Sequence, residues 1–328
     1  MLTRRQIIAF SAASALAPTL GAHPAPAQTP LQAWPTRPIR LIVPFAAGGP
    51  TDAIARIVGE RLSRIWNQQV IIENKGGAGG NIAYEMAARS DPDGYTMVMG
   101  GATQAANRSL YRSLSYDAVA DFAPISFICS FSFFMFVPNS LPTASVKEFI
   151  AYAKQNKLIM ASPGTGSSPH LCAELFKRMA GIEMAHAPYR GAGPAMNDLI
   201  PGRVHLLFSG GATLQNAKAG QVRALGYTGA KRAAMAPEIP TIAEAGVPGF
   251  EVMSWYGLFV PAKTPPDIVK KMNADAVAAL ADPSVTGRLD QLGYTVASST
   301  PEELAAFLKA DIDKWGRVVK DGGIVLQN

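Results

Sequence analysis

Apolar and polar positions along the chain follow two periods, and together they predict strands and helices in regular succession. Apolar residues at helical spacing follow most of the short apolar runs. Strands that alternate with helices predict an α/β fold with largely parallel sheets. The runs typical of buried strands occupy residues 39–45, 69–73, 95–99, 158–161, 184–189, 204–208, 222–227 and 251–260.

The order of these elements predicts two lobes. Residues 138–222 hold a strand–helix series of their own, and the apolar stretch 122–137 before them predicts one or two buried strands. We expect residues 28–135 and 226–328 to form a discontinuous first lobe and residues 136–225 to form the second. Each lobe would be a mainly parallel sheet flanked by helices, and turns at the carboxyl ends of the strands would face each other across a cleft.

The turn at residues 46–52, AAGGPTD, joins the first strand to a helix that extends to residue 65. A helix begins with unpaired N–H groups and a partial positive charge, so this turn suits an anion such as a carboxylate. The alternative, that Gly48 and Gly49 only form the turn, is equally consistent with the sequence. The same succession of strand, glycine-rich turn and helix recurs after Glu73.

The N-terminus carries the features of an export signal. Arg4 and Arg5 precede an apolar, alanine-rich stretch, and Ala25-Pro26-Ala27 ends it as a cleavage site. We therefore expect residues 1–27 to be removed after Ala27 and the protein to reside in the periplasm; the choice between the Sec and twin-arginine routes stays open. A membrane anchor is disfavoured because the apolar stretch is short and contains Pro18.

The composition bears on possible nucleic-acid, metal and cofactor partners and on disulfide bonds. The chain has 328 residues, 48% of them hydrophobic, and without the signal it carries 28 basic against 24 acidic residues. This mild charge contains no basic block, so no nucleic-acid partner is expected. The histidines are isolated in the sequence, so we expect no metal and no cofactor. Cys129 and Cys172 could pair after export, but we expect two free, buried thiols.

Six stretches of the mature chain resemble the Bug family, the extracytoplasmic substrate-binding proteins of tripartite tricarboxylate transporters. The resemblance covers essentially the whole mature chain, with the stretches in the same order. It implies a two-lobed, type II-like periplasmic binding protein that closes on a small organic acid without catalysis. The stretches are VPFAAGGPTDAIAR (43–56), ENKGGAGGNIA (73–83), DGYTMVMG (93–100), ASPGTGSSPHLCAELFK (161–177), PYRGAGPAMNDLIPGRV (188–204) and EIPTIAEAGVPGFEVMSWYGLFVPAKTP (238–265).

The resemblance also implies which residues hold the ligand. Two stretches depart from the family pattern: Ser209 stands where many relatives carry an aspartate, and Thr103 and Gln104 lie in the unusual stretch 100–107. We expect these three residues to line the pocket. The other implied contacts are Ala47, Gly48, Gly49, Pro50, Thr51, Asp52, Gly77, Ala78, Gly79 and Asn81 in the first lobe, and Ser162, Gly164, Thr165, Gly166, Ser168, Tyr189 and Arg190 in the second.

Several of these roles have an alternative. Asp52 either favours the helix dipole as a first-turn acid or holds bridging waters or a protonated group of the ligand. Arg190 is either a solvated loop charge or a carboxylate clamp. Tyr189 and Phe45 either line the pocket against the ligand body or belong to the core.

The expected function is therefore capture of a small carboxylate and its delivery, by a monomer, to the permease subunits of a tripartite transporter. Presentation of the same ligand to a signalling receptor is an alternative that the sequence does not distinguish. A secreted α/β enzyme is a weaker alternative, since the chain has neither a G-x-S-x-G elbow nor a Walker motif.

Overall fold

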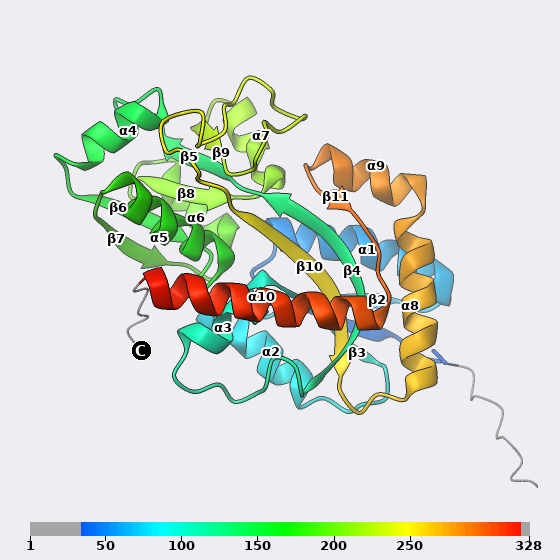
Figure 1. Cartoon of the computed structure of the whole chain (residues 1–328). Helices are drawn as coiled ribbons and strands as arrows, with labels where there is room; N and C mark the ends of the chain where they lie inside the picture. Colours follow the sequence, from blue (N-terminus) through cyan, green and yellow to red (C-terminus); the bar gives the residue numbers. More distant parts are fainter. Residues whose placement is uncertain (1–33, 323–328) are drawn as a thin grey trace, which may run out of the picture. The chain divides into compact units, whose positions relative to one another are not determined.

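Two β-sheets, each flanked by helices, organise the chain in the computed structural model (Figure 1). The structure describes residues 34–322, so the predicted export signal lies outside the described residues. The strands of the first sheet, sheet A, follow the order β11-β4-β10-β3-β1-β2, and those of the second, sheet B, follow β7-β6-β8-β5-β9. This α/β architecture with two sheets agrees with the fold class that the sequence predicts.

Sheet A is built from both ends of the described chain. Its strands are β1 (Ile39–Val43), β2 (Val70–Asn74), β3 (Thr96–Gly101), β4 (Phe122–Ser132), β10 (Met253–Pro261) and β11 (Thr295–Val296). The helical segments from the same parts of the chain are α1 (Pro50–Trp66), η1 (Ala78–Gly80), α2 (Asn81–Ala88), α3 (Ala102–Leu110), α8 (Pro266–Leu280), α9 (Pro283–Gln291) and α10 (Pro301–Gly322).

Sheet B comes from the middle of the chain. Its strands are β5 (Phe134–Pro138), β6 (Leu158–Ser162), β7 (Met184–Pro188), β8 (Leu206–Ser209) and β9 (Val222–Tyr227). The accompanying helical segments are α4 (Val146–Ala153), α5 (Ser168–Ala180), α6 (Ala192–Leu199), η2 (Gly211–Thr213) and α7 (Leu214–Lys218). Ser145 caps α4 as its sequence suggests, because its hydroxyl accepts a hydrogen bond from the N–H of Glu148 at 3.2 Å.

The two sheets are mixed, which corrects the expectation that each is mainly parallel. In sheet A, β1 pairs in parallel with β2 and β3, whereas β10 is antiparallel to β3 and β4. In sheet B, β6 pairs in parallel with β7 and β8, whereas β5 is antiparallel to β8 and β9. β5 and β10, the first strands after each passage between the sheets, run against their neighbours, and β11 is likewise antiparallel to β4. The predicted lobe boundaries themselves stay a prediction.

The passage from sheet A to sheet B is a single apolar run. β4 and β5 are separated only by Phe133, so the predicted stretch 122–137 forms two strands, the larger number allowed by the prediction. Figure 1 shows β4 beside the long strand β10, and their register places Ser254 opposite Phe131. These two strands therefore bring residues of sheet A to the place where the two sheets meet.

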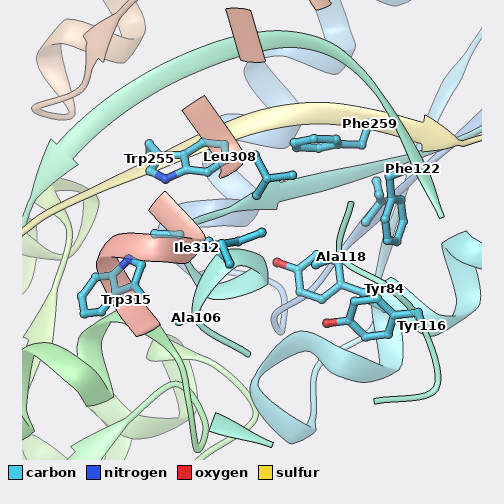
Figure 2. Close-up of a cluster of buried hydrophobic side chains, with 14 of the residues drawn as sticks. Tyr84, Ala106, Tyr116, Ala118, Phe122, Trp255, Phe259, Leu308, Ile312 and Trp315 are labelled. Atoms are coloured by element: carbon cyan, nitrogen blue, oxygen red, sulfur yellow. The ribbon is translucent and has the colours of Figure 1, made fainter. Parts of the chain in front are cut away.

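A hydrophobic core fixes α3 and α10 against sheet A (Figure 2). Trp255 and Phe259 of β10 pack with Leu308 and Ile312 of α10. The indole N–H of Trp255 also donates a hydrogen bond of 2.7 Å to Asp311, a carboxyl whose pKa is raised by burial. The core includes alanines of α3, and Oγ1 of Thr103 in the first turn of this helix lies 3.2 Å from Oγ of Ser168 at the start of α5.

Two helices were not predicted from the sequence. In α3, polar residues such as Gln104 and Asn107 are buried together with alanines, so no apolar stripe marks the helix. In α9, the start signal is local: Pro283 occupies the first turn and Asp282 accepts a hydrogen bond from the N–H of Ser284 at 2.8 Å.

Three further findings concern the described residues only. Cys129 and Cys172 are both buried and free. No helix within residues 34–322 is apolar over a length sufficient to cross a bilayer. The same part of the chain contains no group of three or more histidine, cysteine or acidic side chains placed to hold a metal ion.

Candidate functional site

The turn before α1 is fastened to the helix by one buried carboxylate. Oδ2 of Asp52 accepts hydrogen bonds from the N–H of Gly48 at 3.0 Å and from Nε of Arg56 at 2.9 Å. Burial raises the pKa of Asp52, but the bonds from Arg56 and Gly48 outweigh burial and hold this pKa below its usual value. Gly48 is in the left-handed region at a φ of +81°. The turn is therefore preorganised, with Gly49 and Thr51 directed into a cavity.

That cavity lies where the starts of several helices meet. It contains about 420 Å³ of space between atoms, including open solvent at its mouth. Its lining is made by the first residues of α1, α3, α5 and α6 together with strand ends and loops. The lining residues are Phe45, Gly49, Pro50, Thr51, Thr103, Phe131, Phe133, Pro163, Ser168, Pro169, Ala192, Ser209, Gly210, Ser254 and Tyr256.

The four helix starts are not equivalent donors. At the start of α5, the N–H of Ser168 donates to the hydroxyl of Thr103 at 3.3 Å, the next residue is Pro169, and the N–H of His170 donates to the hydroxyl of Ser167 at 3.4 Å. The first amides of a helix otherwise have no partner within it. We therefore assign the amide donors of the cavity to α1, α3 and α6, whereas α5 contributes its dipole and the Ser168 side chain.

The polar groups of the lining are hydroxyls. Oγ1 of Thr51 lies 2.6 Å from the hydroxyl of Tyr256, and Oγ1 of Thr103 lies 3.2 Å from Oγ of Ser168. Oγ of Ser209 is buried and has no hydrogen-bond partner among the described residues. None of the lining residues carries a charged side chain. An anion in this cavity would thus be stabilised by helix starts and hydroxyl donors rather than by a fixed cation.

Backbone contacts between loops close the edges of the cavity. The N–H of Ala46 donates a hydrogen bond of 2.9 Å to the carbonyl of Arg190, and the hydroxyl of Tyr111 donates one of 3.0 Å to the carbonyl of Thr165. A Cβ atom at Gly79 would overlap this same carbonyl oxygen of Thr165. Glycine at position 79 therefore allows two loops, one from each sheet, to touch.

Six of the predicted contact residues line the cavity, and they come from both sheets. They are Phe45, Gly49, Thr51, Thr103, Ser168 and Ser209. Pro50, which the resemblance also implied, lines it as well. The structure thus brings the turn before α1 and the start of α5 into one cavity, as the sequence predicts.

The other predicted residues lie outside the lining. Gln104 is fully buried and donates a hydrogen bond of 3.0 Å to the carbonyl of Ala118. Asn81 accepts bonds from Asn107 at 2.6 Å and Tyr116 at 2.7 Å. Ala47, Gly48 and Ala78 are exposed, Gly77 is half-buried, and Asp52, Gly79, Ser162, Gly164, Thr165 and Gly166 belong to the turns or to the loop contacts around the cavity.

Tyr189 and Arg190 follow β7 beside these contacts. The hydroxyl of Tyr189 donates a hydrogen bond of 2.7 Å to Asp198, and burial together with this bond raises the pKa of Tyr189 to about 12. Arg190 is exposed, and its backbone carbonyl rather than its guanidinium makes the contact with Ala46. Direct ligand contact by any of the predicted residues, inside or outside the lining, stays a prediction.

A pair of stacked histidines supports the loop between β6 and α5. The rings of His170 and His186 lie 3.8 Å apart between centroids, with 15° between their planes. Nδ1 of His170 accepts a hydrogen bond of 3.1 Å from the N–H of Gly166, and Nε2 of His186 lies 2.7 Å from the hydroxyl of Ser162. The pair thus holds two of the predicted contact residues in place from behind the cavity.

We expect the buried His186 to make the protein less stable in acid. Burial, assisted by the nearby His170, lowers the pKa of His186 from 6.5 to about 3. Below pH 6.5 the unfolded chain binds a proton that the folded chain refuses, so the free energy of unfolding should fall between about pH 6.5 and pH 3. The variant His186→Gln, which cannot titrate, should show a smaller fall in urea unfolding at pH 7 and pH 4.5. An equal pH dependence in both proteins would contradict this.

The sequence analysis missed the residues that β4, β10 and α6 contribute to the cavity. They are Phe131 of β4, Phe133 between β4 and β5, Ser254 and Tyr256 of β10, and Ala192, the first residue of α6. A signal was present: positions 131 and 133, like 254 and 256, are two residues apart and so lie on one side of an extended chain. Strand residues at the passage between two lobes are therefore candidates for a cleft wall.

Comparison with known proteins gives consistent relatives over the whole described chain. Residues 54–324 match the family described as 'Tripartite tricarboxylate transporter family receptor'. The periplasmic binding protein BugD is 36% identical with a TM-score of 0.87, covering 90% of this chain and 100% of its own. A protein from R. palustris, solved with adipate, is 40% identical with a TM-score of 0.86, covering 89% and 99%. MatC from Rhodopseudomonas palustris, solved with bound malate, is 32% identical with a TM-score of 0.82, covering 87% and 100%.

Proposed function

Since this chain belongs to the receptor family of tripartite tricarboxylate transporters, with the Bug proteins among its relatives, we propose that it captures a small organic carboxylate and delivers it to a tripartite transporter. Relatives solved with adipate and with malate support a carboxylate as the ligand class. The partner would be the membrane subunits of that transporter, and the binding protein would act as a monomer.

The observation that carries this proposal is the meeting of helix starts at an uncharged cavity. Each helix start carries about half a positive charge, and α1, α3, α5 and α6 all present their first residues to the lining. A carboxylate there gains hydrogen bonds that strengthen in a dry site. The cavity thus favours an anion without requiring a buried lysine or arginine.

The same lining supports binding without turnover. General acid–base catalysis requires a titratable group placed near the reacting atoms. The lining residues include no histidine, acid or lysine, and burial raises the pKa of the Tyr256 hydroxyl above its usual value. We therefore infer that the protein releases its ligand chemically unchanged.

Ligand entry would require the two sheets to separate. The loop contacts at Ala46 and at Thr165 close the edges of the cavity. We infer a hinge at the two passages between the sheets, where β4 continues into β5 and where the chain returns from β9 to β10. This motion corresponds to the predicted lobes 28–135 with 226–328 and 136–225.

The mature chain, residues 28–328, should be stabilised by its ligand without consuming it. At a ligand concentration one hundred times Kd the stabilisation is about 2.7 kcal/mol, which raises Tm by about 4 °C in a chain of this length. Thermal unfolding with adipate, malate, citrate, benzoate and glutamate, followed by chromatography of each acid after incubation, measures both properties. Loss of an acid would indicate an enzyme, and an unchanged Tm with every acid would contradict carboxylate binding.

Export can be tested on the same gene. Expression of the full chain should yield a periplasmic protein that begins at Gln28, as read by N-terminal sequencing or intact mass. A full-length product in the cytoplasm would contradict removal of residues 1–27.

A further inference from the structure

The non-carboxylate part of the proposed ligand would lie against four aromatic side chains of the lining. Phe45, Phe131, Phe133 and Tyr256 all contribute to the cavity wall. Phe131 is the centre of this group: its ring is stacked on Tyr256 at 5.2 Å and 18°, and it meets Phe133 edge to face at 5.4 Å and 87°. A further ring can extend such an arrangement by offset or edge-to-face contact.

The lining favours acids that carry few charges. An amino acid would bring an ammonium group, and the lining has no carboxylate to pair with it. Asp52, at the start of α1, lies outside the lining: its Oδ2 binds the Gly48 amide and Arg56, and its buried Oδ1 has no hydrogen-bond partner among the described residues. A tricarboxylate would bring three charges into a site without a cation, where each unpaired charge loses its hydration. An acid with few charges and an apolar body fits this wall best.

One wall group indicates where the ligand accepts a hydrogen bond. Ser209 is 1% exposed, lines the cavity, and its hydroxyl has no partner among the described residues. Buried hydroxyls are normally paired, so an acceptor on the ligand is the natural partner of this donor.

We propose that the ligand is an aromatic carboxylate, whose planar ring packs on the Phe131–Tyr256 wall while its charge lies at the helix starts and an acceptor faces Ser209. This inference rests on the proposed function of the cavity and specifies the class of acid. Ring contact accounts for a preference of about two- to tenfold over a saturated acid of the same size.

The test compares two acids that differ in the ring alone. Calorimetric titration of the mature protein should give benzoate a lower Kd than cyclohexanecarboxylate by about two- to tenfold. The variant Phe131→Leu should remove most of this preference. The matched control Phe149→Leu, which changes a buried phenylalanine of α4 outside the cavity, should retain it.

The outcomes separate this inference from the proposed function. Binding of adipate without benzoate, or equal Kd values for benzoate and cyclohexanecarboxylate, would overturn the aromatic ligand and leave carboxylate capture standing. A preference for benzoate that survives in Phe131→Leu would overturn the assigned wall. Failure of every acid in the panel would overturn the proposed function itself, and with it this inference.

Discussion

Replacement of Gly79 by alanine is expected to weaken ligand binding at least tenfold while the protein still folds. A Cβ atom at this position would overlap the carbonyl oxygen of Thr165 and would lie 3.2 Å from the hydroxyl of Tyr111. The loops could accept it only by moving apart, which opens the closed form that encloses the ligand. A tenfold loss of affinity corresponds to about 1.4 kcal/mol. A small displacement of the two packed backbones is enough to cost this much.

The control for this variant is Gly181→Ala. Gly79 has a φ of +61° and Gly181 a φ of +63°, so alanine is strained at both positions by about 1–2 kcal/mol. At Gly181, however, an added Cβ meets nothing within 4 Å. Both variants should therefore lose similar stability in urea unfolding, while calorimetric titration with a bound acid should reveal lower affinity in Gly79→Ala alone. Equal affinities would mean that this loop contact does not belong to the bound form.

A single negative charge at the start of α3 should abolish binding more completely. Thr103 is the second residue of this helix, lines the cavity, and is 5% exposed. With an effective dielectric constant of about 20, an aspartate about 5 Å from a carboxylate opposes it by about 3 kcal/mol, or about a hundredfold in Kd. The acid would not harm the helix, because a negative charge in the first turn favours its dipole.

The companion variant Thr103→Asn removes the same hydroxyl and has nearly the same size as the aspartate, but it is neutral. Its affinity should fall several-fold because it loses the contact with Ser168. The difference between Thr103→Asp and Thr103→Asn, measured by calorimetry with one acid, isolates the charge. If the two variants bind equally, the ligand is not an anion at this site, or it lies away from α3.

The strand–helix units could be predicted because their signals are local. The run before Gly48 and the helix after it have clear periods, and the same holds for the segments around Ser162 and Ser209. Strand direction had no such signal, since an apolar run reads the same in a parallel and an antiparallel pair. The mixed character of both sheets follows from the return of β5 and β10, which is a property of the whole chain.

The cavity was only partly predictable for a related reason. Phe131 and Tyr256 have the sequence character of core residues, and only their position at the passage between the sheets turns them toward the cavity. Gly79 had two possible reasons for being glycine, close approach of a ligand or close approach of another loop. The sequence does not distinguish these two reasons. The structure does, because a Cβ atom at Gly79 would overlap the carbonyl oxygen of Thr165 in another loop.

The uncharged wall has a consequence for the environment in which capture takes place. The periplasm follows the acidity of the surrounding medium, and a receptor built on histidine or carboxylate contacts would change its affinity with every change in that acidity. Helix starts and serine or threonine hydroxyls do not titrate, and Tyr256, the one titratable side chain among the described lining residues, has its pKa raised by burial. We therefore expect the affinity for an ionised carboxylate to depend little on pH, down to the acidity at which the stability loss predicted for His186 begins to unfold the protein.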